Sequence, residues 1–467
     1  MSAFDLASIT PFAEPLWYSR GKSVYYDSSH ERLRKAVRAY VDEKITPNCA
    51  EWETQGFVPK EVLAEHSRRG FTAVAINPAG VSSHMGNIKL PGDIEPRKWD
   101  GFHDLICIDE LARCGYLGVV WALGCGDSIG CPPVVNFGSD AQKKAWLPSV
   151  VNGESRFCLG VTEVDGIVDK FGVLLLTQIA GSDVANISTI AERRGNVYVV
   201  NGAKKWITNG MWATHCTAAV RTGPPGKNGI SALVIPLNSK GVSRRKILNS
   251  GVAASGSTYL EFDDVEVPVS NLLGEENKGF KIIMSSQSSP KTTKELRILL
   301  TDSDFNHERL WLACTSLRLA RICLTDAYSY ALERTTFGKH LIEHQAIKTK
   351  FTTIGADILP AHAFMESLVA LGDASKHAEP RYGGLIALLK VVAGRALEKT
   401  VRETQQVMGG LGYSRTGKGA RIEQISRDMR VMVIGGGSEE ILTELAFVQE
   451  KKDLGTIRGE SLRSSKL

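Results

Sequence analysis

The chain lacks the features that mark several classes of protein. Its 467 residues carry a net charge of +5 without a dense block of lysine and arginine, which argues against a nucleic-acid partner. No apolar run approaches the ~20 residues that span a bilayer, so no membrane is predicted. Residues 1–5 lack the basic and apolar regions of a signal peptide. The nine cysteines include no C-x-x-C pair, and we expect buried, reduced thiols in an intracellular protein.

The last three residues carry a targeting signal. Ser465-Lys466-Leu467 match the peroxisomal address, although a chance tripeptide is the alternative. Residues 451–464 before it are polar, and we expect a flexible, exposed tail from 451 to 467. The predicted localisation is therefore the peroxisome.

Periodicity divides the chain into three regions. Residues 1–155 have a helical pattern, in which Leu33, Val37 and Val41 share one face before a proline interrupts. Residues 156–277 read as strands, and Asn201-Gly202 predicts a hairpin turn. Residues 278–450 return to long helices. This order predicts an α+β fold with an N-terminal helical domain, a middle β domain and a C-terminal four-helix-type domain.

Six short segments in a fixed order carry the functional signal, over about residues 30–450. Together they resemble the acyl-CoA dehydrogenase family of flavoenzymes. The resemblance implies that fold, FAD as cofactor and an acyl-CoA substrate. The segments are Phe157–Glu163, Ala180–Val184, Lys205–Gly210, Phe262–Pro268, Arg334–Lys339 with His344-Gln345, and Gln406–Gly410.

The first segments suit a buried flavin. A tryptophan can stack on the flat ring, and a threonine hydroxyl can bond to its polar edge. Alone, Trp206 would be a core aromatic in a strand; the family implies that it contacts FAD. Gly181, Ser182 and Arg309 match positions on the acyl-CoA side. By the same resemblance, the flavin is also contacted by Leu159, Val161, Thr162 and Thr208.

Arg334 offers a forked cation that suits a pyrophosphate, although alone it would be a surface charge. In the family this contact comes from a second subunit, as do those that match Phe337, Gln406 and Gly410. The resemblance therefore implies an oligomer, a homotetramer or a homodimer. The remaining predicted cofactor contacts are Gln345, Ser438 and Glu440.

The catalytic base is predicted from an absence. Most family members have a glutamate where Gly436 stands, and a minority place it in a Glu-Arg-Leu segment instead, as in isovaleryl- and long-chain enzymes. Glu308-Arg309-Leu310 matches that arrangement, although Glu308 alone could be a solvated charge. We predict that Glu308 takes the α-proton and that the Gly436 N–H binds the thioester oxygen.

Two motifs are set aside. The pattern H-x-x-E-H at His340–His344 is typical of a zinc protease, but no third ligand is evident and it lies inside a family motif. No metal is therefore predicted. Gly435–Gly437 is no P-loop, because no Gly-Lys-Ser/Thr follows.

Two stretches depart from the family pattern, 164–178 and 286–303. We interpret them as translated, unspliced introns, and the alternative is genuine loops. The first separates Thr162 from Gly181, and the second precedes Glu308, so either could impair the site.

The predicted function is FAD-dependent α,β-dehydrogenation of an acyl-CoA in fatty acid β-oxidation. Electron-transfer flavoprotein or O2 would accept the electrons. Two alternatives stay open: a peroxisomal acyl-CoA oxidase, and an acyl-CoA- or flavin-binding protein that the inserts have impaired. Gly436 argues against nitroalkane oxidase, which uses an aspartate there.

Overall fold

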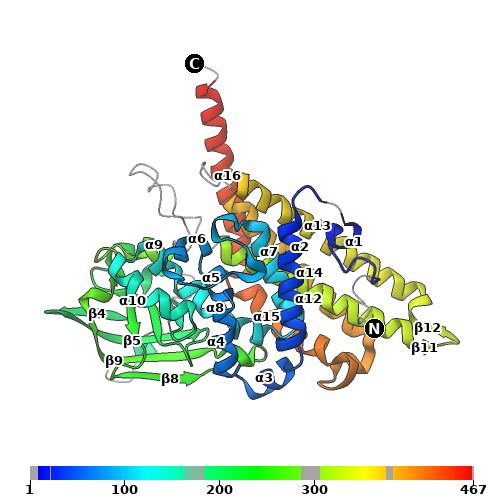
Figure 1. The fold of residues 1–467 in the computed structure, drawn as a ribbon, viewed down its shortest axis with the longest axis horizontal. Helices are drawn as coiled ribbons and strands as arrows, with labels where there is room; N and C mark the ends of the chain where they lie inside the picture. Colours follow the sequence, from blue (N-terminus) through cyan, green and yellow to red (C-terminus); the bar gives the residue numbers. More distant parts are fainter. Residues whose placement is uncertain are drawn as a thin grey trace. The chain divides into compact units, whose positions relative to one another are not determined.

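The chain folds into two units, each built from segments that are distant in the sequence (Figure 1). The computed structural model describes residues 9–21, 23–163, 167–168, 174–175, 184–284, 306–374 and 382–464. Unit 1 contains residues 1–49, 100–117 and 306–467, and unit 2 contains residues 50–99 and 118–305. The predicted order of helical, β and helical regions is confirmed. The exact domain bounds 1–155, 156–277 and 278–450 stay a prediction.

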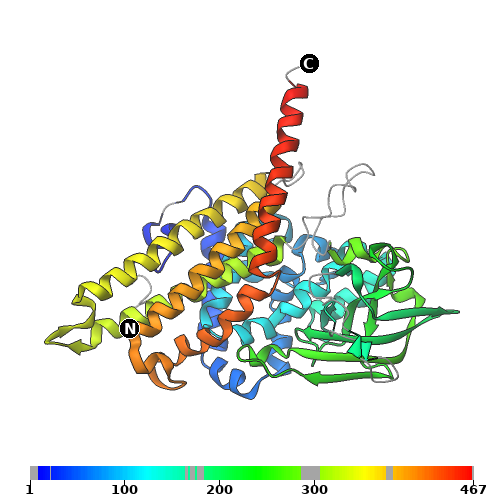
Figure 2. The same cartoon turned by 180° about the vertical axis from the view of Figure 1, so that it is seen from behind.

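Unit 1 is a helical bundle arranged around the 28-residue helix α12 (Figure 2). Two apolar side chains of this helix, Cys314 and Leu317, are each at most 1% exposed. These side chains pack against residues of α7, α13 and α14 in one core. The helices of the unit are α1 Leu16–Arg20, α2 Ser28–Tyr40, α7 Gly101–Leu111, α12 Asn306–Glu333, α13 Gln345–Ala374, α14 Gly383–Met408, α15 Ala420–Ile434 and α16 Glu439–Ser464, with the short strands β11 Thr335–Thr336 and β12 Lys339–His340.

Buried ion pairs join α12 to α7. The Arg321 guanidinium donates to both carboxylate oxygens of Asp109, at 2.8 and 3.0 Å, and Arg318 also pairs with Asp109. The neighbouring Glu110 accepts from Arg38 of α2 at 2.8 and 2.9 Å. Because a buried charge is costly without its partner, these contacts specify how the three helices pack.

Unit 2 is built on an eight-stranded, mostly antiparallel sheet, four of whose strands, β4, β5, β8 and β9, are labelled in Figure 1. The strand order is β10-β7-β6-β4-β5-β9-β8, and β1 pairs with β6 in parallel. Its buried face is apolar. The strands are β1 Phe157–Gly160, β4 Ile190–Arg194, β5 Val197–Ile207, β6 His215–Arg221, β7 Ile230–Pro236, β8 Val242–Lys246, β9 Thr258–Pro268 and β10 Leu272–Leu273, and β2 Ile167–Val168 pairs with β3 Leu174–Leu175. The helices are α3 Cys49–Gln55, α4 Lys60–Arg68, α5 Phe71–Ala75, α6 Pro78–Val81, α8 Leu117–Gly130, α9 Pro132–Phe137, α10 Asp140–Val151 and α11 Gly279–Met284.

The hairpin turn predicted at Asn201-Gly202 is wrong. Strand β5 runs through both residues and pairs with β9, with a bulge between Val200 and Gly202. The Asn201 side chain donates to Asp264 Oδ1 at 2.9 Å and accepts from the Asp264 N–H at 2.8 Å. The two hydrogen bonds between Asn201 and Asp264 thus stabilise a β-bulge. Asparagine and glycine are as suited to a bulge as to a turn. The chain reverses earlier, between β4 and β5.

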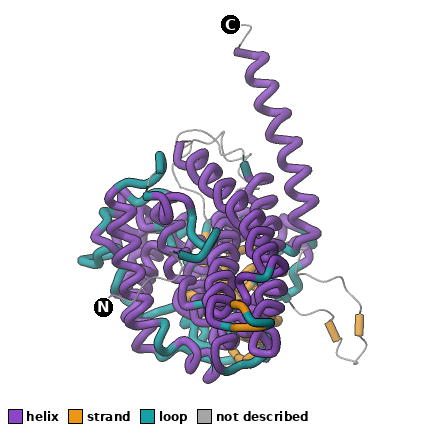
Figure 3. The backbone as a smooth tube through the Cα atoms, turned by 90° about the vertical axis from the view of Figure 1, so that its right-hand side faces the viewer, coloured by secondary structure: helices purple, strands orange, loops and turns teal. Residues whose placement is uncertain are grey.

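The flexible tail predicted from residue 451 differs from the structure. Helix α16 continues to Ser464, as one unbroken helix beside the C-terminus (Figure 3). The segment 451–464 contains no proline and is rich in lysine, arginine, glutamate and leucine, which are good helix formers. A polar sequence was mistaken for an unstructured one. The address at 465–467 lies outside the described residues.

The cysteines and the apolar helices complete the comparison. All nine cysteines are free thiols, and all but Cys125 are buried, as expected. Two described helical stretches, Leu117–Phe137 and Gln345–Gly372, are long and apolar enough to cross a membrane by length and composition alone. This differs from the expectation that no run would qualify. The first is 78% buried within the protein, which accounts for its composition.

Candidate active site

In unit 1 the structure places Glu308 beside Gly436. Glu308 lies in the first turn of α12, and Gly436 lies in the turn between α15 and α16. A Cβ atom added to Gly436 would lie 3.9 Å from Glu308 Oε1 and 2.5 Å from Leu312 Cδ1. Glu308 therefore faces the space beside position 436, where a carboxylate from that position would start.

Arg309 is tied to the same turn. It is 8% exposed, and its Nε donates to the Gly436 carbonyl at 3.3 Å. Its Nη1 lies 3.4 Å from Asn306 Oδ1 in the preceding turn of the helix. Arg309 thus acts on the protein backbone here.

The electrostatics of Glu308 suit a base. Burial raises the pKa of the Glu308 carboxyl above its ordinary value, and the positive charges of Arg309, Lys390 and His307 oppose the rise. A raised pKa makes a carboxylate a stronger base than one in water.

Two residues near Glu308 were missed from the sequence. His307 Nε2 donates a hydrogen bond at 2.8 Å to the Asp104 carboxylate, which joins the start of α12 to α7. Lys390 is 2% exposed in α14. A single lysine within the apolar run Leu385–Ala393 was the available signal.

In unit 2 two of the predicted flavin segments lie side by side, the first at Phe157–Glu163 and the second at Lys205–Gly210. The Lys205 N–H donates to the Thr162 carbonyl at 2.8 Å, and the Lys204 ammonium reaches the Val161 carbonyl at 3.3 Å. Trp206 has φ 63° and is 53% exposed, unlike its buried neighbour Ile207. Leu159, Val161, Thr162 and Thr208 are half-buried. These segments present one flat aromatic ring with nearby hydroxyls.

Asn209 fixes the end of the second segment. It is buried with φ 61°, and its side-chain oxygen accepts from the Gly126 N–H at 2.8 Å. Its side-chain amide donates to the Ser255 carbonyl at 2.8 Å. The backbone at Thr208 is therefore fixed by the contacts of Asn209 with the segments that contain Gly126 and Ser255.

Glu163 and Lys204 form a buried clamp beneath the first segment. Lys204 Nζ donates to Glu163 Oε1 and to the Ala219 carbonyl, both at 2.7 Å. The Glu163 carboxylate also accepts from the N–H and hydroxyl groups of Ser188 and Thr189, at 2.5 to 2.9 Å. Hydrogen bonds and the lysine lower the pKa of Glu163 to about 2, despite its burial. The chain before residue 164 is thus joined directly to the chain after residue 184.

The other predicted cofactor residues lie on several segments of unit 1, some of them close to Gly436 in the sequence. Arg334 follows the end of α12, and Phe337 is 97% exposed on the β11–β12 hairpin. Gln345, Gln406 and Gly410 are exposed as well. Ser438 and Glu440 lie at the start of α16, two and four residues after Gly436. Gly181 and Ser182 lie outside the described residues, as do 164–166, 169–173, 176–178 and 286–303 of the two inserts.

The H-x-x-E-H segment does not form a helix that would align its histidines, because residues 339–340 are strand and Leu341–Glu343 is a 3-10 turn. Among the described residues, the one group with metal-ligand spacing is His30, Asp100 and His103. In the structure these side chains bond to one another, because His30 Nε2 and His103 Nδ1 lie 3.2 and 2.7 Å from the same Asp100 oxygen, Oδ1.

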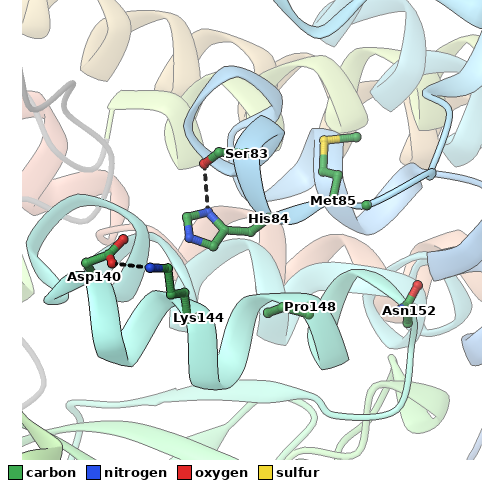
Figure 4. Close-up of a pocket in the computed structure, with 8 residues that line it drawn as sticks. Ser83, His84, Met85, Asp140, Lys144, Pro148 and Asn152 are labelled. Carbon is green, nitrogen blue, oxygen red and sulfur yellow. Dashed lines mark hydrogen bonds and ion pairs between the residues drawn. The ribbon is translucent and has the colours of Figure 1, made fainter.

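A surface cavity of about 440 Å³ lies in unit 2, between the Ser83–Gly86 segment and α10 (Figure 4). Ser83 bonds His84 Nδ1 at 2.9 Å, and Lys144 pairs at 2.6 Å with Asp140, one turn earlier on α10. None of the predicted site residues lines it. The polar groups of this cavity are partnered with one another, so it is distinct from the candidate site.

Comparison with known proteins identifies the family. Models of the acyl-CoA dehydrogenase N-terminal, middle and C-terminal domains match residues 27–154, 177–265 and 298–447. The chain belongs to the acyl-CoA dehydrogenase family. The matched ranges leave out residues 164–176 and 286–297 of the two inserts.

Individual relatives cover nearly the whole chain. Acyl-CoA dehydrogenase AFT10-1 of Alternaria alternata is 52% identical over 460 residues, which cover 97% of this chain and 98% of that protein. Acyl-CoA dehydrogenase apdG of Emericella nidulans is 36% identical over 466 residues, covering 97% and 99%. The structure of butyryl-CoA dehydrogenase from Megasphaera elsdenii has a TM-score of 0.74 at 25% identity, covering 91% of this chain and all of that one.

As a family member the chain is an FAD-dependent oxidoreductase that acts on acyl-CoA. The described residues fit this cofactor. The half-exposed indole of Trp206 suits a flat ring, and the hydroxyls of Thr162 and Thr208 suit its polar edge. The exposed Arg334 guanidinium suits a pyrophosphate.

Replacing Glu163 by Gln tests the clamp. The change leaves the Lys204 ammonium buried without its counter-charge, so we expect a loss of about 3–5 kcal/mol of stability and weaker flavin retention. In the parent, the stability from Glu163 is present above pH 4.5 and is lost as the pH falls towards 2, since its folded pKa is the lower one. Acid unfolding and flavin content measure both effects.

Glu192→Gln is the matched control, because Glu192 is an exposed strand residue paired only with Arg194. It should leave both measurements unchanged. Equal stability and flavin content in Glu163→Gln and the parent would contradict the role of the clamp.

Proposed function

We propose that the chain dehydrogenates an acyl-CoA thioester between its α and β carbons to give a trans-2-enoyl-CoA. The observation that carries the proposal is Glu308, which faces the glycine turn at Gly436 in a position where burial raises its pKa. A carboxylate at this point suits removal of a weakly acidic α-proton.

The residues of the chain have separate tasks in this proposal. Glu308 takes the α-proton and holds it on its carboxyl group. The Gly436 N–H donates to the thioester oxygen, where negative charge develops, and a glycine can approach that oxygen closely. FAD, when bound, accepts the β-hydride. Arg309 holds the carbonyl of Gly436 and so orients the turn towards the substrate.

We propose that two copies of the chain complete each flavin site, in a homodimer or homotetramer. Glu308 and Arg334 are 26 positions apart along α12 and its end, or about 39 Å at 1.5 Å per residue. One extended FAD molecule is shorter than this distance. If both residues serve a flavin, they serve different flavins, which favours a partner that supplies Arg334 and Phe337.

The choice of electron acceptor depends on the compartment in which the protein works. We propose a role in the β-oxidation of fatty acids, with electron-transfer flavoprotein or O2 as acceptor. The tripeptide Ser465–Leu467 favours a peroxisomal enzyme, and hence the oxidase alternative with O2. Formation of H2O2 during turnover in air separates the two acceptors.

Replacing Glu308 by Gln tests the base. In the parent, anaerobic addition of mixed acyl-CoAs should bleach the flavin band, with a rate that rises with pH through a midpoint above the ordinary glutamate value. The Gln variant should retain flavin and bleach at least ~100-fold more slowly, since it has no base. Stopped-flow absorbance measures both rates.

Glu398→Gln is the control, because Glu398 is paired with Arg430 away from the glycine turn. Its bleaching rate should match that of the parent. Bleaching of Glu308→Gln at the full rate would rule out Glu308 as the base. Flavin that no acyl-CoA bleaches in the parent would instead support the impaired binding protein.

Removing residues 164–178 and 286–303 tests the interpretation as introns. Glu163 already bonds the chain beyond the first insert, so we expect a deletion variant to fold and to bind more flavin per chain than the full sequence. Sequencing of transcripts should find messages that lack both stretches. Uniform presence of both, with a full flavin content in the longer protein, would overturn this interpretation.

Localisation is tested with the address itself. A fluorescent protein joined to the N-terminus leaves Leu467 free, and we expect fluorescence that coincides with a peroxisomal marker. Deletion of residues 465–467 should disperse it through the cytosol. The same distribution for both proteins would exclude the tripeptide as the signal.

A further inference from the structure

Lys390 is a buried cation without a role so far. It lies in the first third of α14 with apolar neighbours, and it is 2% exposed. Burying an ammonium is costly unless it is fully bonded. Lys390 Nζ donates to the Val433 carbonyl and to the Gly437 carbonyl, both at 2.8 Å.

The two carbonyls lie on either side of the glycine turn. Val433 is in the last turn of α15, where helix carbonyls have no partner within the helix. Gly437 comes just before α16. One ammonium group therefore bridges the end of one helix and the start of the next, across Gly435 and Gly436.

The turn has little else to define its shape. Gly436 and Gly437 have φ values of 67° and 103°, which favour glycine and leave the backbone many alternatives. No side chain in residues 435–437 can pack. The contacts described for the Gly436 carbonyl come from Arg309, so the two cations fix the turn from different helices.

Lys390 also acts on Glu308 by charge. The lysine opposes the effect of burial on the pKa of Glu308, and Glu308 in turn opposes the effect of burial on Lys390. Burial still lowers the pKa of Lys390 to about 8. The charged groups that act on this pair are His307 and Arg309 of α12 and Glu439 and Glu440 of α16.

We propose that Lys390 is a positioning residue, which fixes the Gly435–Gly437 turn and, through its charge, keeps the facing Glu308 carboxyl ionised for proton abstraction. The role rests on the proposed dehydrogenation. It explains why a charged residue occupies a helix position that an apolar side chain would fill at less cost.

Three variants of the full-length, flavin-loaded protein test the proposal. Lys390→Met removes the donor and the charge, Lys390→Gln keeps a donor, and Lys390→Arg keeps the charge. Lys399→Met is the control on the same helix, where Lys399 is exposed and pairs with Asp357 at 2.6 Å. Flavin content and melting temperature first identify the variants that fold.

Hydrogen exchange of the peptides that cover residues 433–438 reports on the turn without any turnover. We expect at least ~10-fold faster exchange in Lys390→Met, with smaller changes in Lys390→Gln and Lys390→Arg. The pH profile of flavin bleaching reports on Glu308. Its midpoint should rise by about one pH unit in Lys390→Met and Lys390→Gln, and stay in place in Lys390→Arg.

The outcomes are distinct. Unchanged exchange and an unchanged midpoint in Lys390→Met, or in Lys390→Gln if the Met variant does not fold, would overturn the proposal. Equal effects in Lys399→Met would reduce Lys390 to a general contributor to stability and overturn it too. If no acyl-CoA bleaches the parent flavin, the proposed function fails, and the exchange measurement alone decides whether Lys390 fixes the turn.

Discussion

The pairing of Asp109 with Arg318 and Arg321 is the contact on which the proposed base depends. It is buried between α7 and α12, and it sets the rotation of α12 about its own axis. Side chains on a helix point about 100° apart, so a shift of one position would turn Glu308 away from Gly436. An apolar interface alone could tolerate such a shift, since Leu, Cys and Ala can repack. The three charges of Asp109, Arg318 and Arg321 cannot tolerate it, because each displaced charge would be left buried without a partner.

In each unit a single buried lysine also fixes a local segment through its hydrogen bonds. Lys204 holds the Val161 carbonyl and the Glu163 carboxylate in unit 2, and Lys390 holds two carbonyls of the glycine turn in unit 1. In each case a buried ammonium binds irregular backbone that carries a predicted site residue. Irregular segments cannot satisfy their own carbonyls as helices and strands do, and a lysine can supply three donors from a distance.

The sequence predicted features that depend on local pattern. The order of helical, β and helical regions and the free cysteines follow from periodicity and composition. The prediction from sequence was wrong where one pair of residues is common in two kinds of local structure. Asn201-Gly202 suits a β-bulge as well as a hairpin turn. Glu308 was found through the resemblance, and its partner Lys390 was not, because the carbonyls of Val433 and Gly437 are 43 and 47 residues away. Contacts between a side chain and a distant backbone leave no trace in residue spacing.

The space at Gly436 has an evolutionary consequence. Moving the base from Glu308 to position 436 would need a Cβ atom in a left-handed backbone, with Leu312 displaced. If the new glutamate came first, its Cβ atom would lie 3.9 Å from Glu308 Oε1, and the two negative charges would oppose each other's ionisation. If Glu308 were lost first, no base would remain. In the proposed mechanism either order passes through an impaired protein, which opposes relocation of the base.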